Sequence, residues 1–180
     1  MFKRLVLIWL ANQFTMDRPR WLCRIKNGLL RCAGVHVPNN VFIDHGFQCL
    51  SPGNITIEEN VSLGHDNHIW AFTPVRIGRF TQTAKDLLLI SGSHEIDSFA
   101  PAASQEIVIG PGCWIGARVT ILGGVTVGKG CVIGGGALVK NSIPDWSVAV
   151  GIPARVIRKR EPADQIINPI RNYSPADLED

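Results

Sequence analysis

His94 is the side chain of this sequence best suited to acid–base chemistry, because it lies in an irregular segment, residues 91–106, that is rich in Gly, Ser and Pro. Such a composition is typical of a loop, and loops often carry function. A neutral imidazole can accept a proton near pH 7. Glu95, Asp97 or Glu106 could hold its tautomer, as could a backbone carbonyl. The alternative interpretation is that each of these carboxylates is a solvated residue of the loop with no catalytic role.

A second polar group lies in the run from Leu63 to Trp70. Its imidazoles, carboxylate and amide can hydrogen-bond to hydroxyl groups, and its indole can stack on a sugar ring. The sequence therefore predicts a surface for a hydroxylated ligand formed by His65, Asp66, Asn67, His68 and Trp70.

A scaffold must position these groups, and the most regular feature of the chain is a six-residue period between residues 109 and 144. Neither an amphipathic helix nor an alternating strand has this period. A Gly often follows the aliphatic residue directly, and a small or apolar residue comes four positions after it. The aliphatic positions are Ile109, Ile115, Ile121, Val127, Ile133 and Val139.

A hexapeptide repeat predicts a parallel β-helix, a triangular prism in which each side is one hexapeptide and three sides complete a coil. Such a fold is stable only as a stack, because each coil leaves backbone groups that the next coil must pair. Fainter copies at Ile57, Leu63, Ile69, Ile77, Thr83 and Leu89 extend the prism.

The repeat has two breaks. The step from Ile57 to Ile77 exceeds three hexapeptides by two positions, and so does the step from Leu89 to Ile109. We therefore expect a small excess in each of these coils. The second excess falls within residues 91–106, which we predict to be a functional loop.

The cysteines fit the scaffold as thiols. They form no CxxC pair, and an odd number does not favour a disulfide framework. Cys113 and Cys131 are three hexapeptides apart and should stack as buried fillers. Buried thiols indicate a reducing compartment, so we expect a cytoplasmic protein. The other cysteines are Cys23, Cys32 and Cys49.

The 180 residues are 46% hydrophobic, which is enough for one core. We expect an all-β fold with a basic helical N-terminal segment at 1–34, the β-helix at 35–158 and an irregular C-terminal tail at 159–180. The net charge is only +3, and no nucleic-acid partner is expected.

The N-terminal segment contains seven basic residues but only one acidic residue before position 36, and a short apolar run at 5–11. This run is too short to span a bilayer, which requires about 20 residues. A charged start before an apolar run is also found in signal peptides, but no small-x-small cleavage site follows. The segment is therefore interpreted as helices covering an open end of the prism, or as a basic amphipathic element, residues 1–31, resting on the inner face of a membrane.

The motifs of the second half resemble those of the left-handed β-helix acyltransferases of the hexapeptide-repeat type. The resemblance covers most of residues 35–158, and it alone implies the left-handed path, because the usual crossover rule favours the opposite hand. It rests on Cys113-Trp-Ile-Gly-Ala117, Gly123-Gly-Val-Thr-Val-Gly128, Ile133-Gly-Gly-Gly-Ala-Leu-Val139, Ile143-Pro144 and Val150-Gly-Ile-Pro-Ala-Arg-Val-Ile-Arg158.

This resemblance implies a homotrimer that binds acetyl-CoA between neighbouring prisms, with no metal. His94 matches the family's catalytic base, and Glu95 is the carboxylate we expect to orient it. The resemblance also implies an acetyltransferase that acts on sugar or polysaccharide hydroxyls. The alternatives are an N-acetyltransferase of an amino-sugar nucleotide and a scaffold without catalytic activity.

For CoA, the resemblance implies that main-chain groups of Ala117 and Gly135 bind the pantetheine, next to Trp114, and that Arg155 and Arg158 approach the phosphates. One departure concerns Lys140. Many relatives have Thr-Lys-Asp before the Ile-Pro pair, whereas this chain has Lys140-Asn-Ser142. Lys140 is also expected to bind CoA, but adjacent strand residues face opposite ways, so it would approach from the face opposite to that of the usual lysine.

On the acceptor side, the position at which galactoside-acting relatives carry an Asn is Gly64 here. The run that follows, with His65, Asp66, Asn67 and Trp70, favours surface polysaccharides over free galactosides. His65, His68 and His94 could alternatively bind zinc, as in the carbonic anhydrases that share this fold. Those enzymes have a pair of His four residues apart late in the chain, which is absent here.

Overall fold

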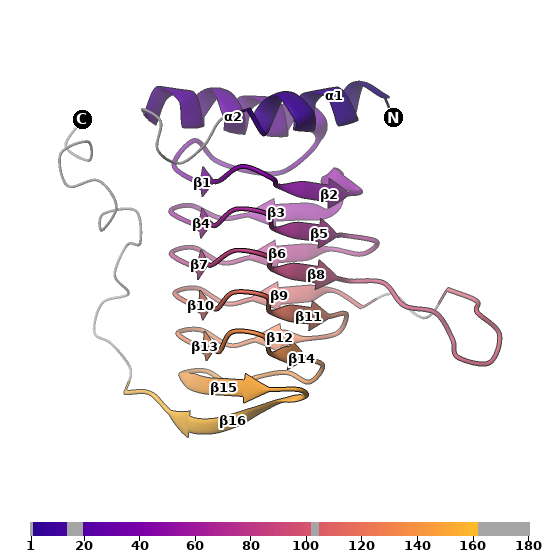
Figure 1. The fold of residues 1–180 in the computed structure, drawn as a ribbon, viewed down its shortest axis with the longest axis vertical. Coiled ribbons are helices and arrows are strands. Elements are labelled where there is room, and N and C mark those ends of the chain that lie inside the picture. The colour runs from indigo at the N-terminus through magenta and orange to yellow at the C-terminus, as the bar shows by residue number, and fades with distance from the viewer. Residues whose placement is uncertain (1, 14–19, 102–104, 162–180) are drawn as a thin grey trace.

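The computed structural model describes residues 2–13, 20–101 and 105–161. Its main body is a left-handed parallel β-helix, a prism of stacked coils with two helices across one end (Figure 1). The helices are α1 (Phe2–Ala11) and α2 (Arg20–Ala33). The strands form three sheets, one for each side of the prism.

Sheet 1 contains β1 (Phe42–Ile43), β4 (Ser62–Leu63), β7 (Gln82–Thr83), β10 (Trp114–Ile115), β13 (Val132–Ile133), β15 (Ser147–Gly151) and β16 (Ala154–Lys159). Sheet 2 contains β2 (Gln48–Leu50), β5 (His68–Trp70), β8 (Leu88–Ile90), β11 (Thr120–Leu122) and β14 (Leu138–Val139). Sheet 3 contains β3 (Ile55–Ile57), β6 (Val75–Ile77), β9 (Ile107–Ile109) and β12 (Thr126–Val127). A short 3-10 helix, η1 (Pro52–Asn54), precedes β3.

The six-residue period is the inward-facing row of these sheets, as predicted. In sheet 3, Ile57 pairs with Ile77, Ile77 with Ile109 and Ile109 with Val127. All four side chains are buried, and so are the other predicted positions of the regular region. Stacked aliphatic columns therefore fill the prism from end to end.

The expectation about the second break was wrong in size. Ile109 pairs with Ile77 and not with Leu89. A regular coil is three hexapeptides long. The separation of Ile77 and Ile109 in the sequence exceeds that length by more than two further hexapeptides, so the insertion is much longer than the two residues expected. Leu89 lies on the next sheet of the same coil, where it pairs with Ile69 and Ile121.

All of the irregularities lie at one edge of the prism, the corner between sheets 2 and 3, which we call corner 2–3 (residues 51–54, 71–74, 91–106, 123–125 and 140–142). The small excess between Ile57 and Ile77 lies at residues 71–74, and the long insertion extends from the next coil below (Figure 1). Extra residues are accommodated there because they leave the chain between two strands, and the strands on both sides of the corner keep their pairing.

The two cysteines of the repeat are buried and free, as predicted. The Cys113 thiol donates a hydrogen bond to the Gly128 carbonyl at 3.1 Å, and the Cys131 thiol donates one to the Pro144 carbonyl at 3.1 Å. Each thiol therefore joins its own coil to a neighbouring corner.

Helices α1 and α2 pack on each other and close the end of the prism with Ile8, Ala11, Leu30 and Ala33, all buried. Two polar side chains of α2 satisfy carbonyls of the first coil. Asn27 donates from Nδ2 to the Val41 oxygen at 2.8 Å, and Lys26 donates from Nζ to the Asp44 oxygen at 2.7 Å. The interpretation of this segment as a cover for the open edge agrees with these contacts.

At the other end, β15 pairs in parallel with β13 and then turns back into β16, which is antiparallel to it. This hairpin was not foreseen, because its strands do not follow the six-residue period. The predicted C-terminal tail falls mostly on residues 162–180, which lie outside the described part of the chain.

The buried lysine predicts a pH-dependent stability. Burial lowers the pKa of the Lys26 ammonium from 10.5 to about 8, partly offset by the nearby Asp44 carboxylate. The unfolded chain thus binds more protons than the folded one between pH 8 and 10.5, and the free energy of unfolding should rise with pH through this window.

We expect this rise, measured relative to the variant Lys26→Met by chemical denaturation, to reach about 3 kcal/mol at pH 10.5. The comparison is made as a difference because other groups titrate in the same range. A difference that stays flat from pH 7.5 to 10.5 would show that Lys26 is solvated in the folded protein.

Candidate active site

One edge of the prism carries several of the predicted functional residues. We call it corner 1–2, the corner between sheets 1 and 2 (residues 44–47, 64–67, 84–87, 116–119 and 134–137). Successive coils place equivalent residues one above another, and each is joined to the next by a main-chain bond, for example from the Gly136 N–H to the Ala117 oxygen at 2.8 Å. The equivalent residues are His45, His65, Lys85, Ala117 and Gly135.

Ala117 and Gly135 are neighbours in this column, as their spacing predicts. The approach of the two coils is so close that a Cβ on Gly116 would lie 2.6 Å from the Gly135 nitrogen. Among the described residues, the N–H groups of Ala117 and Gly135 donate to no other backbone group. They remain available to carbonyl oxygens of a ligand lying along the corner.

The other residues predicted to bind CoA lie around the lower part of the prism. Arg155 pairs with Val150, whose side chain lies against Gly134, so this arginine continues the direction of the column. Arg158 is exposed on the same strand. Trp114 is 57% exposed on the outer face of sheet 1.

Lys140 lies elsewhere. Its side chain is exposed, just after the end of β14. Because Val139 pairs with Ile121, Lys140 lies beside Leu122. Leu122 is in register with Ile90 and Trp70, which lie at the margin of sheet 2 next to corner 2–3. Lys140 is therefore at corner 2–3, across sheet 2 from Ala117 and Gly135.

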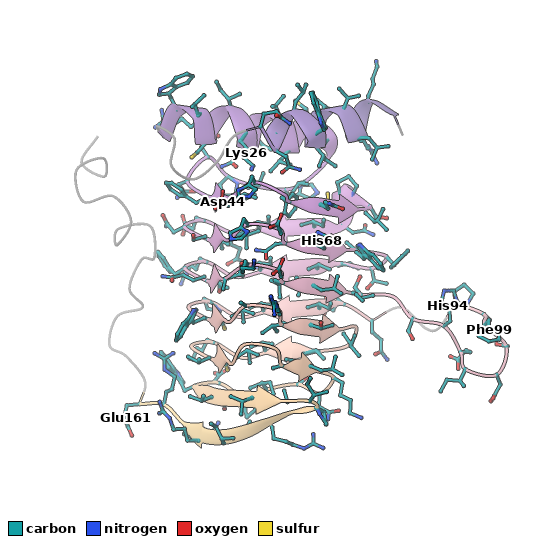
Figure 2. The ribbon with its side chains drawn as sticks, in the orientation of Figure 1. Lys26, Asp44, His68, His94, Phe99 and Glu161 are labelled. Atoms are coloured by element: carbon teal, nitrogen blue, oxygen red, sulfur yellow. The ribbon has the colours of Figure 1, made fainter. Side chains whose placement is uncertain are left out.

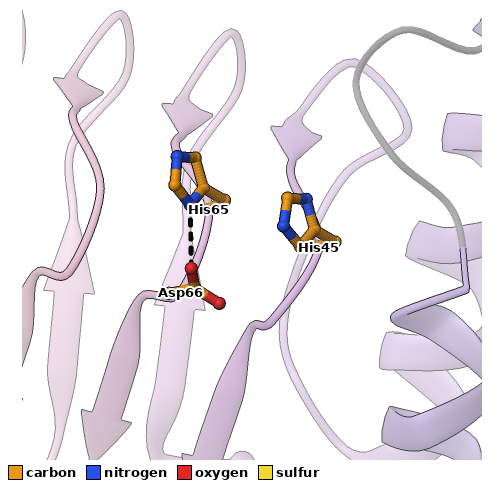
Figure 3. Close-up of side chains that lie close together, drawn as sticks. All are labelled: His45, His65 and Asp66. Carbon is orange, nitrogen blue, oxygen red and sulfur yellow. Dashed lines mark hydrogen bonds and ion pairs between the residues drawn. The ribbon is translucent and has the colours of Figure 1, made fainter.

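Two stacked histidines lie in corner 1–2 on the two coils nearest the helices (Figure 3). The rings of His45 and His65 are parallel within 3°, with centroids 5.1 Å apart. Nδ1 of His65 lies 2.8 Å from Asp66 Oδ2, and this hydrogen bond holds the pKa of the Asp66 carboxyl below its ordinary value. His45 was missed in the sequence, although it precedes His65 by the same step that separates the paired residues Ile57 and Ile77.

These groups are a poor match for zinc. Ligand atoms of His45, His65 and Asp66 lie within 4.8 Å of one another, but parallel rings direct their lone pairs along parallel lines and not toward a common point about 2.0–2.1 Å away. The alternative set of His65, His68 and His94 does not converge either, since His68 lies on the prism and His94 on the extended loop (Figure 2).

The prediction that Asn67 contacts a ligand is wrong. Its side chain is 1% exposed and points into the corner, where Nδ2 donates to Thr83 Oγ1 at 2.6 Å and Oδ1 accepts from the Leu87 N–H at 2.8 Å. Asn67 thus stabilises the corner of the prism. Trp70 is exposed, but it lies toward corner 2–3, at the other side of sheet 2 from His65 and Asp66.

The loop 91–106 leaves the prism through a buried polar clamp at corner 2–3. The Thr73 hydroxyl lies 2.9 Å from the Ser91 carbonyl and 2.8 Å from the Gln105 carbonyl, so it links both ends of the loop. The Ser91 hydroxyl donates to the Thr73 carbonyl at 2.8 Å. The two ends of the loop are therefore tied to one residue of the scaffold edge, Thr73.

His94 lies on this loop, well away from the prism of its own chain (Figure 2). Its Nδ1 is 2.8 Å from the Phe99 carbonyl oxygen. Because a carbonyl only accepts, Nδ1 carries the proton and the lone pair is on Nε2. Phe99 itself adopts a left-handed conformation, with φ 53°.

The group that orients the imidazole in this structure is thus a backbone carbonyl. The sequence allows a carbonyl as an alternative to the Glu95 carboxylate. The main chain of Glu95 supports the turn instead: its N–H donates to the Ala100 oxygen at 2.8 Å, and its carbonyl accepts from the Phe99 N–H at 2.9 Å. The role predicted for the Glu95 carboxylate stays a prediction.

Comparison with known proteins agrees with this architecture. Residues 106–141 match the family model for the bacterial transferase hexapeptide (six repeats). WcaF of Escherichia coli K12, named as a colanic acid biosynthesis acetyltransferase, is 33% identical over 158 residues, which are 86% of this chain and 87% of WcaF. The chain therefore belongs to the hexapeptide-repeat acetyltransferases.

Other relatives match over different lengths. Rv3034c of Mycobacterium tuberculosis, named as an acetyltransferase, is 37% identical over 61% of this chain, but the match spans only 38% of Rv3034c. Among solved structures, a maltose O-acetyltransferase from Clostridium difficile 630 has a TM-score of 0.78 and 28% identity, covering 88% of this chain and 85% of that one. A galactoside acetyltransferase in complex with coenzyme A has a TM-score of 0.70 and 25% identity, covering 88% and 81%.

The clamp at the base of the loop generates a prediction. Thr73→Val removes the hydroxyl but keeps the shape, leaving the Ser91 and Gln105 carbonyls without the single hydroxyl proton that they share. We expect a loss of about 1–3 kcal/mol in the free energy of unfolding and faster proteolysis within 91–106, measured by denaturation and limited digestion. The matched control is Thr126→Val, an exposed threonine of β12, which should change neither quantity. Equal digestion of both variants would contradict the role of the clamp.

Proposed function

We propose that this protein is an acetyl-CoA-dependent O-acetyltransferase that acts on a sugar hydroxyl in the biosynthesis of a surface polysaccharide, in the cytoplasm. The observation that carries the proposal is the tautomer of His94: a backbone carbonyl holds the proton on Nδ1 and leaves Nε2 free to act as a base. The family membership and the corner of exposed main-chain amides support the same chemistry.

The proposed transfer is direct. Nε2 of His94 takes the proton from the acceptor hydroxyl as its oxygen attacks the thioester carbon of acetyl-CoA. The C–S bond then breaks, the sulfur of CoA receives the proton from the imidazolium, and the acetyl ester leaves with the acceptor. Cys113 and Cys131 are buried in the prism, so neither is placed to form an acyl-enzyme.

The donor is proposed to lie along corner 1–2, with its pantetheine amides paired to Ala117 and Gly135 and its phosphates near Arg155 and Arg158. Trp114 would provide an apolar wall. This direction follows the column of corner residues, and the galactoside acetyltransferase similar to this chain was solved with coenzyme A.

The base and the donor corner are separated on one chain. His94 extends from corner 2–3 (Figure 2), whereas Ala117 and Gly135 lie at corner 1–2, and the width of sheet 2 separates the two corners. The outer face of sheet 2 is also apolar, with Leu50 and Trp70 exposed. We propose that a homotrimer buries this face and brings the His94 edge of one subunit to the corner 1–2 edge of its neighbour.

For the acceptor, His65 and Asp66 of one subunit are proposed to bind hydroxyl groups, and Trp70, which lies at the corner 2–3 side of sheet 2, is proposed to stack on the sugar ring from the neighbouring subunit. His45 joins this set, since it stacks on His65 at the same edge. The similarity to a colanic acid biosynthesis acetyltransferase supports a polysaccharide precursor as the substrate class.

The first test measures thiol release from acetyl-CoA over a panel of sugars, amino sugars and sugar nucleotides. We expect a hydroxyl acceptor, and we expect His94→Ala to lower kcat by about 10²- to 10⁴-fold while CoA binding by calorimetry changes little. Glu95→Gln tests the second candidate for the orienting group: we expect it to retain activity, because the Phe99 carbonyl already holds the Nδ1 proton, and a loss like that of His94→Ala would assign the orienting role to the Glu95 carboxylate. Full activity in His94→Ala would remove the assigned base, and the absence of CoA binding to the wild type would remove the proposed function.

A second prediction concerns the shared site. The variants His94→Ala and Ala117→Glu should each be inactive, the first for lack of the base and the second because a carboxylate blocks the donor corner. Mixed after denaturation and refolding together, they should regain activity, since some interfaces then combine an intact loop with an intact corner. Activity that stays at the level of the separate variants would place both groups of one site on the same subunit.

A further inference from the structure

Helices α1 and α2 present an apolar surface on the side that faces away from the prism. Their inward sides are identified by the buried residues Ile8, Ala11, Leu30 and Ala33. The opposite sides carry an unusual number of exposed large apolar side chains, including two indoles that are 62% and 59% exposed. This end surface is formed by Leu5, Val6, Trp9, Leu10, Trp21 and Ile25.

The charge on the same helices is of one sign. Neither helix contains an acidic residue. Lys26 and Arg31 are used internally, the first against the Asp44 carbonyl and the second against the Val37 carbonyl at 2.8 Å. Among the side chains that the structure describes, the exposed cations next to the apolar surface are Lys3, Arg4 and Arg24.

We propose that this end surface docks the protein onto an anionic lipid bilayer. Apolar side chains with tryptophans on one face and cations around them are the composition of helices that lie in the membrane interface. The cations favour negatively charged headgroups, and the same charges oppose the approach of a second copy of this surface. No helix within the described residues is long and apolar enough to cross a membrane, which leaves α1 and α2 lying along its plane.

The docking would also orient the rest of the molecule. Because α1 and α2 lie across the end of the prism, the prism axis would stand upright on the bilayer (Figure 1). The loop 91–106 leaves the third coil, two coil spacings or about 10 Å beyond the first coil. This docking does not depend on the proposed acetyl transfer, and it would hold corner 2–3 at a fixed height above the lipid surface.

The experiment uses the whole protein with vesicles of pure phosphatidylcholine or of phosphatidylcholine and phosphatidylglycerol mixed two to one, separated by flotation. We expect binding to the anionic vesicles only, weakening as salt is raised. The variant Trp9→Ser/Trp21→Ser should reduce the partition coefficient by about tenfold or more, and Lys3→Glu/Arg24→Glu should do the same. The controls are Ile157→Ser, an exposed apolar residue of β16, and Lys129→Glu, a cation on the side of the prism; both should bind as the wild type does.

A second readout uses Cys32, the exposed cysteine on α2. An environment-sensitive fluorophore attached there should shift to the blue with anionic vesicles, but not with pure phosphatidylcholine. Equal partition to both vesicle types, or unchanged binding in the tryptophan variant, would overturn the proposal. A third result would also overturn it. If the wild type binds no lipid, and its assemblies dissociate into smaller ones in the variant Trp9→Ser/Trp21→Ser, the end surface is an interface between proteins.

Discussion

The hydrogen bonds between the main chains of successive coils are the constraint on which the rest of this structure depends. In one column the Gly78 N–H donates to the Ile109 oxygen at 2.7 Å, the Gly110 N–H to the Val127 oxygen at 2.7 Å and the Gly128 N–H to the Ile143 oxygen at 2.8 Å. These bonds need equal steps along each side of the prism, so additional residues can leave only at a corner. The proposed function is therefore divided between regular corners, which offer unpaired amides, and one irregular corner, which projects a loop.

A stack of this kind has two open ends, and the protein closes them differently. At the C-terminal end a β-hairpin continues the sheet, whereas at the N-terminal end the side chains of Asn27 and Lys26 bond to carbonyls of the first coil. The helical solution buries an ammonium group, whose desolvation lowers its pKa to about 8. It also leaves a second helical face that no described part of this chain covers, which is the basis for the proposed lipid contact.

The loop shows how a rigid scaffold can hold an imidazole far from itself. Its two ends are tied to Thr73, and its tip is shaped by local main-chain bonds around His94 and Phe99. The histidine thus has a tautomer that a backbone carbonyl defines. Under the proposed trimer, the length of the insertion is what lets this imidazole reach a neighbouring prism.

By itself, the sequence determined the period, the buried aliphatic row, the stacked pair Ala117 and Gly135, and the loop that carries His94, because these follow from the six-residue geometry of one side. Only the tertiary structure decided which coils pair across the insertion, that Asn67 points inward, and that Lys26 is buried. Those facts depend on hydrogen bonds and contacts between residues far apart in the chain. A local period does not say which other segment of the chain a given segment will contact. The long insertion hid the register, since the pairing of Ile77 with Ile109 is selected by all the bonds between two coils together.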